Sequence, residues 1–219
     1  MDGLPRCFFC CKSIVVVWFW VPLVPWVPRV RWVRLFVDLA DMKARGGGGG
    51  AVLLKFCGVV PYAVDSTGSI CVLLAREAFG RDKNMWSAFA GRVDAADDRS
   101  VPEAIAAREC YEESMGILGS AEDLNKVLRE KATRVDVKDG IHYLLPMVFD
   151  DTLPRRFMDT RATVMAAVGS ATYSPFLEKD QVMWMPVQNI KVSTMRFRPG
   201  FWRDIDFLSQ RLAQTCALT

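Results

Sequence analysis

Five consecutive glycines, Gly46 to Gly50, divide this chain of 219 residues into two segments of different character. Glycine has no side chain to pack and loses more conformational freedom on folding than any other residue, so a run of glycines predicts a flexible linker. We do not expect a helix or a strand to continue through it. The sequence therefore predicts an N-terminal extension with its linker, residues 1–50, and a folded domain, residues 51–219.

The extension is apolar and basic. Residues 14–27 read IVVVWFWVPLVPWV, a run shorter than the roughly 20 residues that a bilayer-spanning helix needs. Its prolines remove helix hydrogen bonds that lipid does not replace. Three interpretations stay open: an organelle-targeting peptide, a segment that attaches to a membrane surface through residues 1–45, and an extension without a function.

The folded domain is nearly neutral, because residues 1–50 carry a net charge of +4 and the remaining residues carry −1. A broad surface for nucleic acid needs an excess of Lys and Arg, so the composition argues against a nucleic-acid partner. The seven cysteines are an odd number, the four beyond residue 50 show no regular spacing, and the chain has one histidine, His142. This argues against a disulfide framework and against structural zinc. A reducing compartment follows, and the cytoplasm is the favoured location, with organelle targeting or membrane attachment as alternatives.

The pattern of apolar and turn-forming residues predicts a mixed α/β domain. Two β-branched segments flank the turn Asp65–Gly68 and predict a β-hairpin. A capping box formed by Ser100 and Glu103 predicts the start of a helix, and Gly116 predicts its end. The expected strands are residues 52–64, 69–75, 85–90, 141–149 and 182–187, and the expected later helices are residues 162–171 and 201–214.

Three glutamates share one face of the predicted first helix. At about 100° per residue, Glu109, Glu112 and Glu113 fall within roughly a 100° arc. Such a cluster repels itself unless cations are present, and oxygen ligands suit Mg²⁺ or Mn²⁺. A solvated acidic helix face is the alternative interpretation of the same pattern.

Two segments together resemble the signature of the Nudix hydrolases. The first reads WSAFAGRVD from Trp86, and the second reads RECYEESMGI from Arg108. The family's motif runs Gly, five residues, Glu, seven residues, then Arg-Glu-aliphatic-x-Glu-Glu-x-Gly-aliphatic. The resemblance implies an α/β/α sandwich with a mixed β-sheet over most of residues 51–219.

The sequence departs from that motif in four places. Ala90 replaces a further glycine, and Asp97 replaces the mid-loop glutamate. Ten residues rather than seven separate Asp97 from Arg108, and Met115 moves Gly116 one position late. We expect the late glycine to extend the helix by one residue, while every glutamate of the helix is retained.

The resemblance implies a metal site on the helix, occupied by Mg²⁺ or Mn²⁺. A backbone carbonyl at Ala90 or Gly91 would complete the coordination, and Arg108 would orient a glutamate. Glu178, outside the motif, is a further candidate ligand, with an exposed loop glutamate as the alternative. The implied catalytic residues are Arg108, Glu109, Glu112 and Glu113, and the implied metal ligands are Glu109, Glu112, Glu113, Ala90, Gly91 and Glu178.

Trp86 and Trp184 are candidates for stacking on a nucleobase, although tryptophans in strands are more often part of a core. The implied activity is metal-dependent hydrolysis of a diphosphate bond in a nucleoside diphosphate linked to another moiety, a small-molecule nucleotide substrate. The alternatives are a non-catalytic binding module of the same fold, and hydrolysis of capped RNA or of an inositol diphosphate. For the latter, Lys191, Arg196 and Arg198 offer a basic cluster with Arg203. The oligomeric state stays open.

Overall fold

The structure is a computed structural model that describes residues 54–94, 101–168 and 174–217. The N-terminal extension lies outside these residues, so its separation from the folded domain and its role in targeting or membrane attachment stay predictions. Within the described part of the chain, no helix is both long enough and apolar enough to cross a bilayer.

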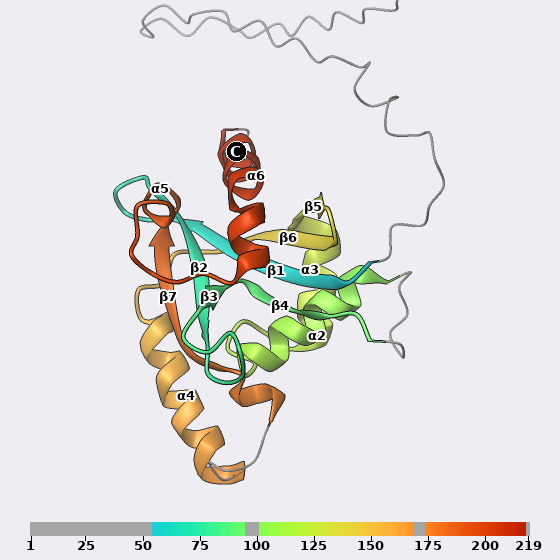
Figure 1. Cartoon of the computed structure of the whole chain (residues 1–219), viewed down its shortest axis with the longest axis vertical. Helices are drawn as coiled ribbons and strands as arrows, with labels where there is room; N and C mark the ends of the chain where they lie inside the picture. Colours follow the sequence, from blue (N-terminus) through green and yellow to red (C-terminus); the bar gives the residue numbers. More distant parts are fainter. Residues whose placement is uncertain (1–53, 95–100, 169–173, 218–219) are drawn as a thin grey trace, which may run out of the picture. The chain divides into compact units, whose positions relative to one another are not determined.

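A seven-stranded mixed sheet forms the centre of the domain (Figure 1). The strand order is β3-β2-β1-β6-β5, with β4 paired to β1 and β7 paired to β2. The central strand β1 pairs with β6 in parallel and with β2 and β4 in antiparallel. The strands are β1 Phe56–Val64, β2 Ile70–Glu77, β3 Trp86–Ser87, β4 Phe89–Arg92, β5 Thr133–Val137, β6 Gly140–Pro146 and β7 Lys179–Pro186.

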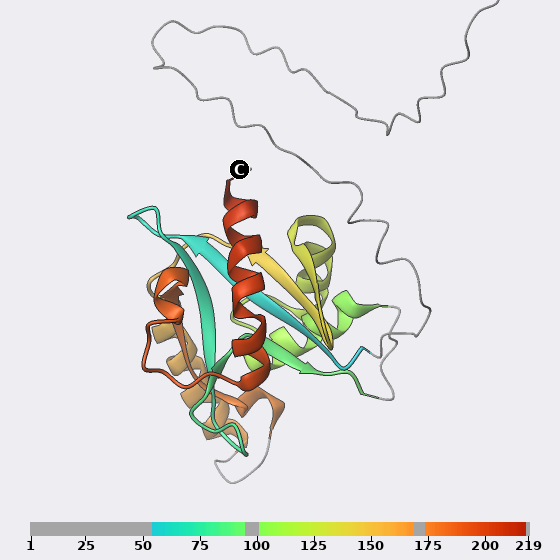
Figure 2. The same ribbon diagram turned by 45° about the horizontal axis from the view of Figure 1, so that its top comes forward.

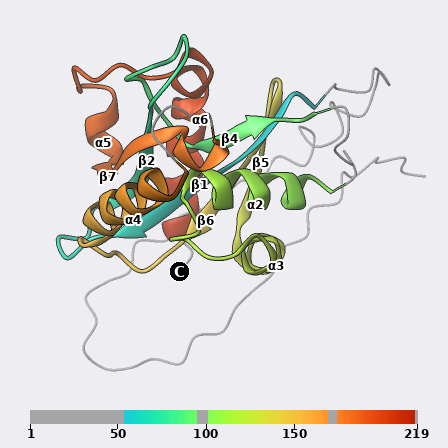
Figure 3. The same ribbon diagram turned by 90° about the horizontal axis from the view of Figure 1, so that it is seen from below.

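Helices cover both faces of this sheet, as the α/β/α prediction requires (Figures 2 and 3). One buried apolar cluster joins the sheet to α2, α3 and α4, and a second joins the opposite face to α5 and α6. In Figure 2, α6 crosses in front of the sheet. The helices are α2 Pro102–Glu113, α3 Ala121–Lys131, α4 Leu153–Val168, the short 3₁₀ helix η1 Pro175–Leu177, α5 Val187–Ile190 and α6 Pro199–Cys216.

The predicted hairpin is confirmed. The chain reverses between β1 and β2 at Asp65, whose Oδ1 accepts hydrogen bonds from the backbone N–H groups of Thr67 (2.8 Å) and Ser69 (2.9 Å). Gly68 takes a positive φ of 82°, which a residue without a side chain adopts at little cost. The local sequence therefore determines this turn.

The single strand expected over residues 85–90 was wrong, because the structure has two short strands there. β3 pairs with β2, whereas β4 pairs with the first half of β1, and Ala88 lies between them. The segment thus changes its pairing partner from one strand to the next. This change brings Ala90 and Gly91 alongside Gly58 and Cys57 of β1.

The start of α2 also differs from the prediction. Its N-cap residue is Val101, which makes no side-chain capping hydrogen bond, and Ser100 lies outside the described residues. Glu103 instead accepts a hydrogen bond of 2.8 Å from the hydroxyl of the buried Tyr143 on β6. The Glu103 side chain, which a capping box would use at the start of the helix, therefore bonds to Tyr143 of the sheet.

The extra residue before Gly116 does not lengthen α2. The helix ends at Glu113, and the Gly116 and Met115 amides donate to the carbonyls of Tyr111 (2.9 Å) and Glu112 (3.1 Å), which is the Schellman arrangement. Met115 itself takes a left-handed φ of 54°. Ser114 is thus the C-cap residue that follows the helix, and Met115 occupies the position that usually belongs to glycine.

The later elements match the sequence in kind but not always in extent. β6, β7 and α6 lie where strands and a helix were expected. The short helix expected over residues 162–171 begins earlier, because α4 starts at Leu153. Asp150 precedes it and accepts a 2.9 Å hydrogen bond from the Thr152 amide. α3 and β5 were not predicted, although Ser120 caps α3 through the Asp123 amide (3.1 Å).

Candidate active site

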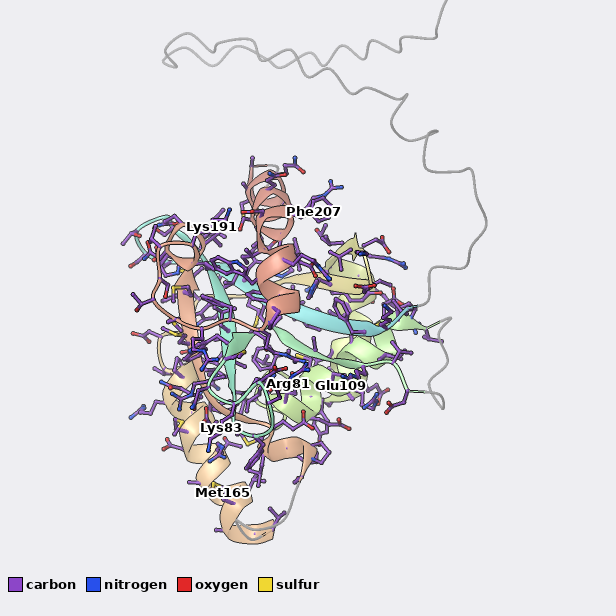
Figure 4. The ribbon with its side chains drawn as sticks, viewed as in Figure 1. Arg81, Lys83, Glu109, Met165, Lys191 and Phe207 are labelled. Carbon is purple, nitrogen blue, oxygen red and sulfur yellow. The ribbon has the colours of Figure 1, made fainter. Side chains whose placement is uncertain are left out.

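A cavity of about 940 Å³ opens beside β4 and the charged face of α2. It is also lined by the first residues of β1, the loop after β2 and the beginning of α6. Figure 4 places Glu109 and Arg81 beside one another in projection, and both line this cavity. Its carboxylate-bearing residues are Asp82, Asp94, Glu109, Glu112, Glu113, Asp139 and Glu178, and its cationic residues are Lys55, Arg81, Arg92, Arg108, Arg198 and Arg203.

Glu109 lies directly against the backbone of Gly91. A Cβ atom built on Gly91 would be 2.0 Å from the Glu109 carboxyl carbon. Only a residue without a side chain permits this approach, because real Cβ contacts do not fall below 3.0 Å. The predicted partners Gly91 and Glu109 are therefore brought together by the pairing of β4 with β1 and by the packing of α2 against β4.

Arg108 contacts two of the three helix glutamates. Its Nη1 atom lies 2.8 Å from Glu109 Oε1 and 3.4 Å from Glu112 Oε2. The guanidinium is about one-third exposed, and the two carboxylates are mostly buried. Arg108 therefore restrains both glutamates at the cavity wall, as the sequence implied for one of them.

The carboxyl of Glu109 titrates near neutral pH. Burial raises its pKa from the ordinary value of 4.5 to about 7, and the charges of Glu112 and Glu178 act in the same direction against the lowering effect of Arg108. Glu178 lines the same cavity from the end of η1. Glu178 and the helix carboxylates thus form one electrostatically coupled group.

Glu113 also lines the cavity, but its side chain is only 3% exposed. Its Oε2 accepts a 2.8 Å hydrogen bond from the Ala90 amide, and its Oε1 lies 2.9 Å from the Lys179 ammonium. Burial raises the pKa of Glu113 to about 8 against the lowering effect of Lys179. The third helix glutamate therefore has two protein partners that the sequence did not reveal.

Lys179 is fully buried beneath this site. Its ammonium lies 2.5 Å from Glu77 Oε1 and 3.3 Å from Ser87 Oγ, in addition to Glu113. Burial acts to lower the pKa of Lys179, but the carboxylates of Glu113 and Glu77 raise it above its ordinary value. Arg198 joins the cluster at 3.1 Å from Glu77 Oε1.

The two candidate stacking tryptophans do not line the cavity. Trp86 is 7% exposed and lies in the apolar cluster between the sheet and α6, with the Arg76 guanidinium over its ring. Trp184 packs on Phe149 on the opposite side of the sheet, and its Nε1 donates a 2.8 Å hydrogen bond to the Asp150 carbonyl. The structure therefore places both rings among packing contacts.

An aromatic end of the cavity was not anticipated. His142 is 3% exposed, and neither of its ring nitrogens has a hydrogen-bond partner among the described residues. Its Nε2 lies 3.7 Å from Asp204 Oδ2, and its ring packs against Phe56 at 5.1 Å. Burial would raise the pKa of Asp204, but His142 and Arg203 hold it below its ordinary value. His142 is the one histidine of the chain, and this was the sequence feature that could have pointed to this end of the cavity.

The basic cluster near the C-terminus is largely neutralised. Arg198 pairs with Glu77 and Asp82, at 3.1 and 3.2 Å. Arg203 pairs with Asp204 at 2.9 Å and with Asp139, and Lys191 pairs with Asp206. These cations therefore do not form an uncompensated basic groove.

The donor chemistry of the cavity fits a hard divalent cation only in part. Glu109, Glu112 and Glu178 offer carboxylate oxygens on its wall, next to the backbone of Gly91. Within residues 54–94, 101–168 and 174–217, however, no group of three or more His, Cys, Asp or Glu side chains is arranged to hold a metal ion. Instead, the Glu109 and Glu112 carboxylates contact Arg108, and the Glu113 carboxylate contacts Lys179.

The signal for Lys179 in the sequence was weak. It lies beside Glu178, and nothing local distinguishes it from an exposed lysine of a polar loop. Its burial follows from the antiparallel pairing of β7 with β2, in which Lys179 is the register partner of Glu77. Only the sheet topology therefore reveals the pair.

No family model matches this sequence, and no match was found among curated proteins. Solved structures do resemble the fold. A Nudix hydrolase of M. smegmatis, RenU, is 15% identical, with 73% of this chain and 86% of that chain covered and a TM-score of 0.41. The NUDIX domain of Shewanella oneidensis NrtR, solved with ADP ribose, is 12% identical, with 81% and 99% covered and a TM-score of 0.42.

A third similar structure is a bifunctional NMN adenylyltransferase/ADP ribose pyrophosphatase of Francisella tularensis, solved with AMP and a Mn ion. It is 16% identical, with 72% of this chain and 42% of that chain covered and a TM-score of 0.37. This chain itself presents a mixed sheet between two helical layers, with a Nudix-like motif on β4 and α2.

Proposed function

We propose that this chain is a metal-dependent pyrophosphohydrolase that cleaves a diphosphate bond in a nucleoside diphosphate linked to another moiety. The observation that supports the proposal is the contact between Gly91 and Glu109 on the wall of a cavity that also contains Glu112. A solvated acidic helix face would require neither the buried carboxyl nor the glycine beneath it. These two features are therefore better explained by a functional site than by a solvent-exposed helix face.

Mg²⁺ or Mn²⁺ is the cofactor that these ligands suit. Glu109, Glu112 and Glu178 would hold it, together with a backbone carbonyl at Ala90 or Gly91. When bound, such an ion neutralises phosphate oxygens and makes water more acidic.

The protein groups then supply orientation and a proton acceptor. Arg108 holds the Glu109 and Glu112 carboxylates at the cavity wall. A carboxylate of this wall that does not hold the ion would accept the proton of the attacking water.

The rest of the cavity suits the two chemically different parts of a nucleotide. Arg81 and Arg92 are exposed cations on its wall, where they can contact phosphate oxygens. Phe56, a half-buried residue of the same wall, provides an aromatic surface for a base. A small-molecule nucleotide is therefore the proposed partner.

Two alternatives make different predictions. A non-catalytic binding module would bind nucleotide without metal-dependent turnover, although all three helix glutamates are retained. A hydrolase of capped RNA or of inositol diphosphates would need an uncompensated basic groove, and Arg198 and Arg203 are paired with carboxylates. The geometry therefore favours the small nucleotide.

The deciding experiment measures nucleotide and phosphate release by the purified full chain with Mg²⁺ or Mn²⁺. The substrates are ADP-ribose, dinucleoside polyphosphates, nucleotide sugars, nucleoside triphosphates, capped RNA and an inositol diphosphate. We expect E112Q to lose at least 100-fold in rate, whereas E130Q, a matched change at an exposed position of α3, should retain full activity. Nucleotide binding without turnover would support the binding module.

The extension is proposed to have no part in the chemistry. A variant that lacks residues 1–50 should therefore keep the activity of the full chain. A soluble truncated protein without activity would show that the extension belongs to the active enzyme. Cytoplasmic location and the two alternatives, organelle targeting and membrane attachment, stay predictions that fluorescence imaging of the tagged full chain tests.

A further inference from the structure

The glutamate-bearing helix places its three carboxylates in two different environments. All three line the cavity, but Glu109 and Glu112 contact Arg108, whose guanidinium is partly exposed. Glu113 is buried, and each of its oxygens contacts a cationic or N–H donor of the protein. The shared helix face predicted from the sequence is therefore divided by the surrounding structure.

The donors of Lys179 are matched by acceptors. An ammonium group has three N–H donors, and Lys179 has three oxygens within 3.3 Å, from Glu77, Glu113 and Ser87. Ser87 also lies against Glu77, to which its hydroxyl donates at 3.0 Å. The ammonium thus occupies an oxygen-lined position of the kind that a bound cation would take.

The charges of this cluster also balance. Glu77, Glu113 and Asp82 contribute three carboxylates, and Lys179, Arg198 and Arg81 contribute three cations. A divalent ion at Glu113 would therefore lie beside a buried ammonium and leave an excess of positive charge in a desolvated region. Among the described residues, Arg108 is the cation that contacts Glu109 and Glu112.

We propose that Lys179 is an internal cation that excludes Glu113 from the metal site and makes it a positioning residue for the Ala90–Gly91 segment. Glu113 holds the Ala90 amide, so the neighbouring Gly91 stays beneath Glu109. Glu109, Glu112 and Glu178 are then the carboxylates left to turn toward a metal. This inference rests on the proposed function, because both concern the same site.

The test compares Mn²⁺ affinity, measured by electron paramagnetic resonance of the free ion, in the full chain and its variants. The key variant is the double substitution E113Q/K179M, which removes one buried charge of each sign and so leaves no unpaired ion. We expect its Mn²⁺ affinity to stay within threefold of the wild-type value. E112Q, the reference for a lost ligand, should lose at least tenfold.

A double variant that melts like the wild type but loses as much affinity as E112Q would overturn the inference. If the double variant does not fold, the wild-type protein decides. Its buried Lys179 ammonium should give a slowly exchanging ¹⁵Nζ signal, and this signal should persist when Mg²⁺ saturates the site. Loss of the signal would show that the metal recruits Glu113.

These outcomes separate the inference from the proposed function. A wild-type chain that binds no Mn²⁺ and hydrolyses no substrate removes the basis of both. A chain that binds Mn²⁺ and turns over, but whose double variant loses the metal, retains the function and refutes only the role of Lys179.

Discussion

Gly91 lies so close to Glu109 that a single added methyl group would collide with the catalytic candidate's carboxyl: the Cβ position is 2.0 Å from the carboxyl carbon. The atoms in the way are the far end of a flexible side chain rather than backbone. A substitution at Gly91 should therefore displace the carboxyl and leave the fold intact. The contact can therefore be tested by its effect on activity in a variant whose stability is nearly unchanged.

We expect G91A to lower the hydrolysis rate at least 10-fold with a change of less than about 1 kcal/mol in the free energy of unfolding. G58A is the matched control, because its Cβ would lie 2.4 Å from Ala90 Cβ and 2.9 Å from the Phe89 carbonyl oxygen. It should destabilise the protein by about 1–3 kcal/mol. Rates and urea unfolding of both variants check this, and an active G91A protein would contradict it.

The raised pKa of Glu109 predicts how stability depends on pH in the metal-free protein. A carboxyl whose pKa rises from 4.5 in the unfolded chain to about 7 in the folded protein binds its proton more tightly when folded. Its stabilising contribution is therefore present below pH 4.5 and is lost as pH rises to about 7.

E109Q has no titrating group at this position. We therefore expect its free energy of unfolding, relative to that of the wild type, to rise by up to about 3 kcal/mol from acidic to mildly alkaline pH. Urea unfolding with EDTA at several pH values measures this difference. Parallel stability curves for the two proteins would show that the Glu109 carboxyl is not desolvated as the structure has it.

The hydrogen bond from Tyr143 to Glu103 joins β6 to the first turn of α2. The Tyr143 side chain is buried, and its hydroxyl lies 2.8 Å from Glu103 Oε1. We expect Y143F to destabilise the protein by about 1–2 kcal/mol, because the bond involves a charged acceptor. Y111F on α2 should cost less, since among the described residues Tyr111 makes a ring contact with Phe176 but no hydrogen bond through its hydroxyl. Thermal melts of both variants decide the matter.

Trp184 tests whether a strand tryptophan contacts the substrate. Its indole donates to the Asp150 carbonyl and does not line the cavity. We expect W184F to lose about 1 kcal/mol of stability through that hydrogen bond while its KM stays within twofold of the wild type. R92A, which removes an exposed cation from the cavity wall, should raise KM at least fivefold. A raised KM in W184F together with an unchanged KM in R92A would instead support stacking of Trp184 on the substrate.

Much of the fold follows from local sequence patterns. The hairpin at Asp65 and Gly68 was predictable because the turn is held by its own residues. The division of residues 85–90 into β3 and β4 was not, since it depends on which strand each half pairs with. Likewise, Glu103 satisfies the requirements of a capping box, yet it binds Tyr143, a residue 40 positions away.

The sequence by itself determined the composition of the site: a helix with Glu109, Glu112 and Glu113 in one arc, and a glycine before it. Helical periodicity is local, so these residue types and their spacing can be read without tertiary information. Only the tertiary structure decided that Glu109 lies on Gly91 and that Glu113 is paired with Lys179. Those contacts depend on strand register and desolvation, which arise when segments distant in sequence pack together.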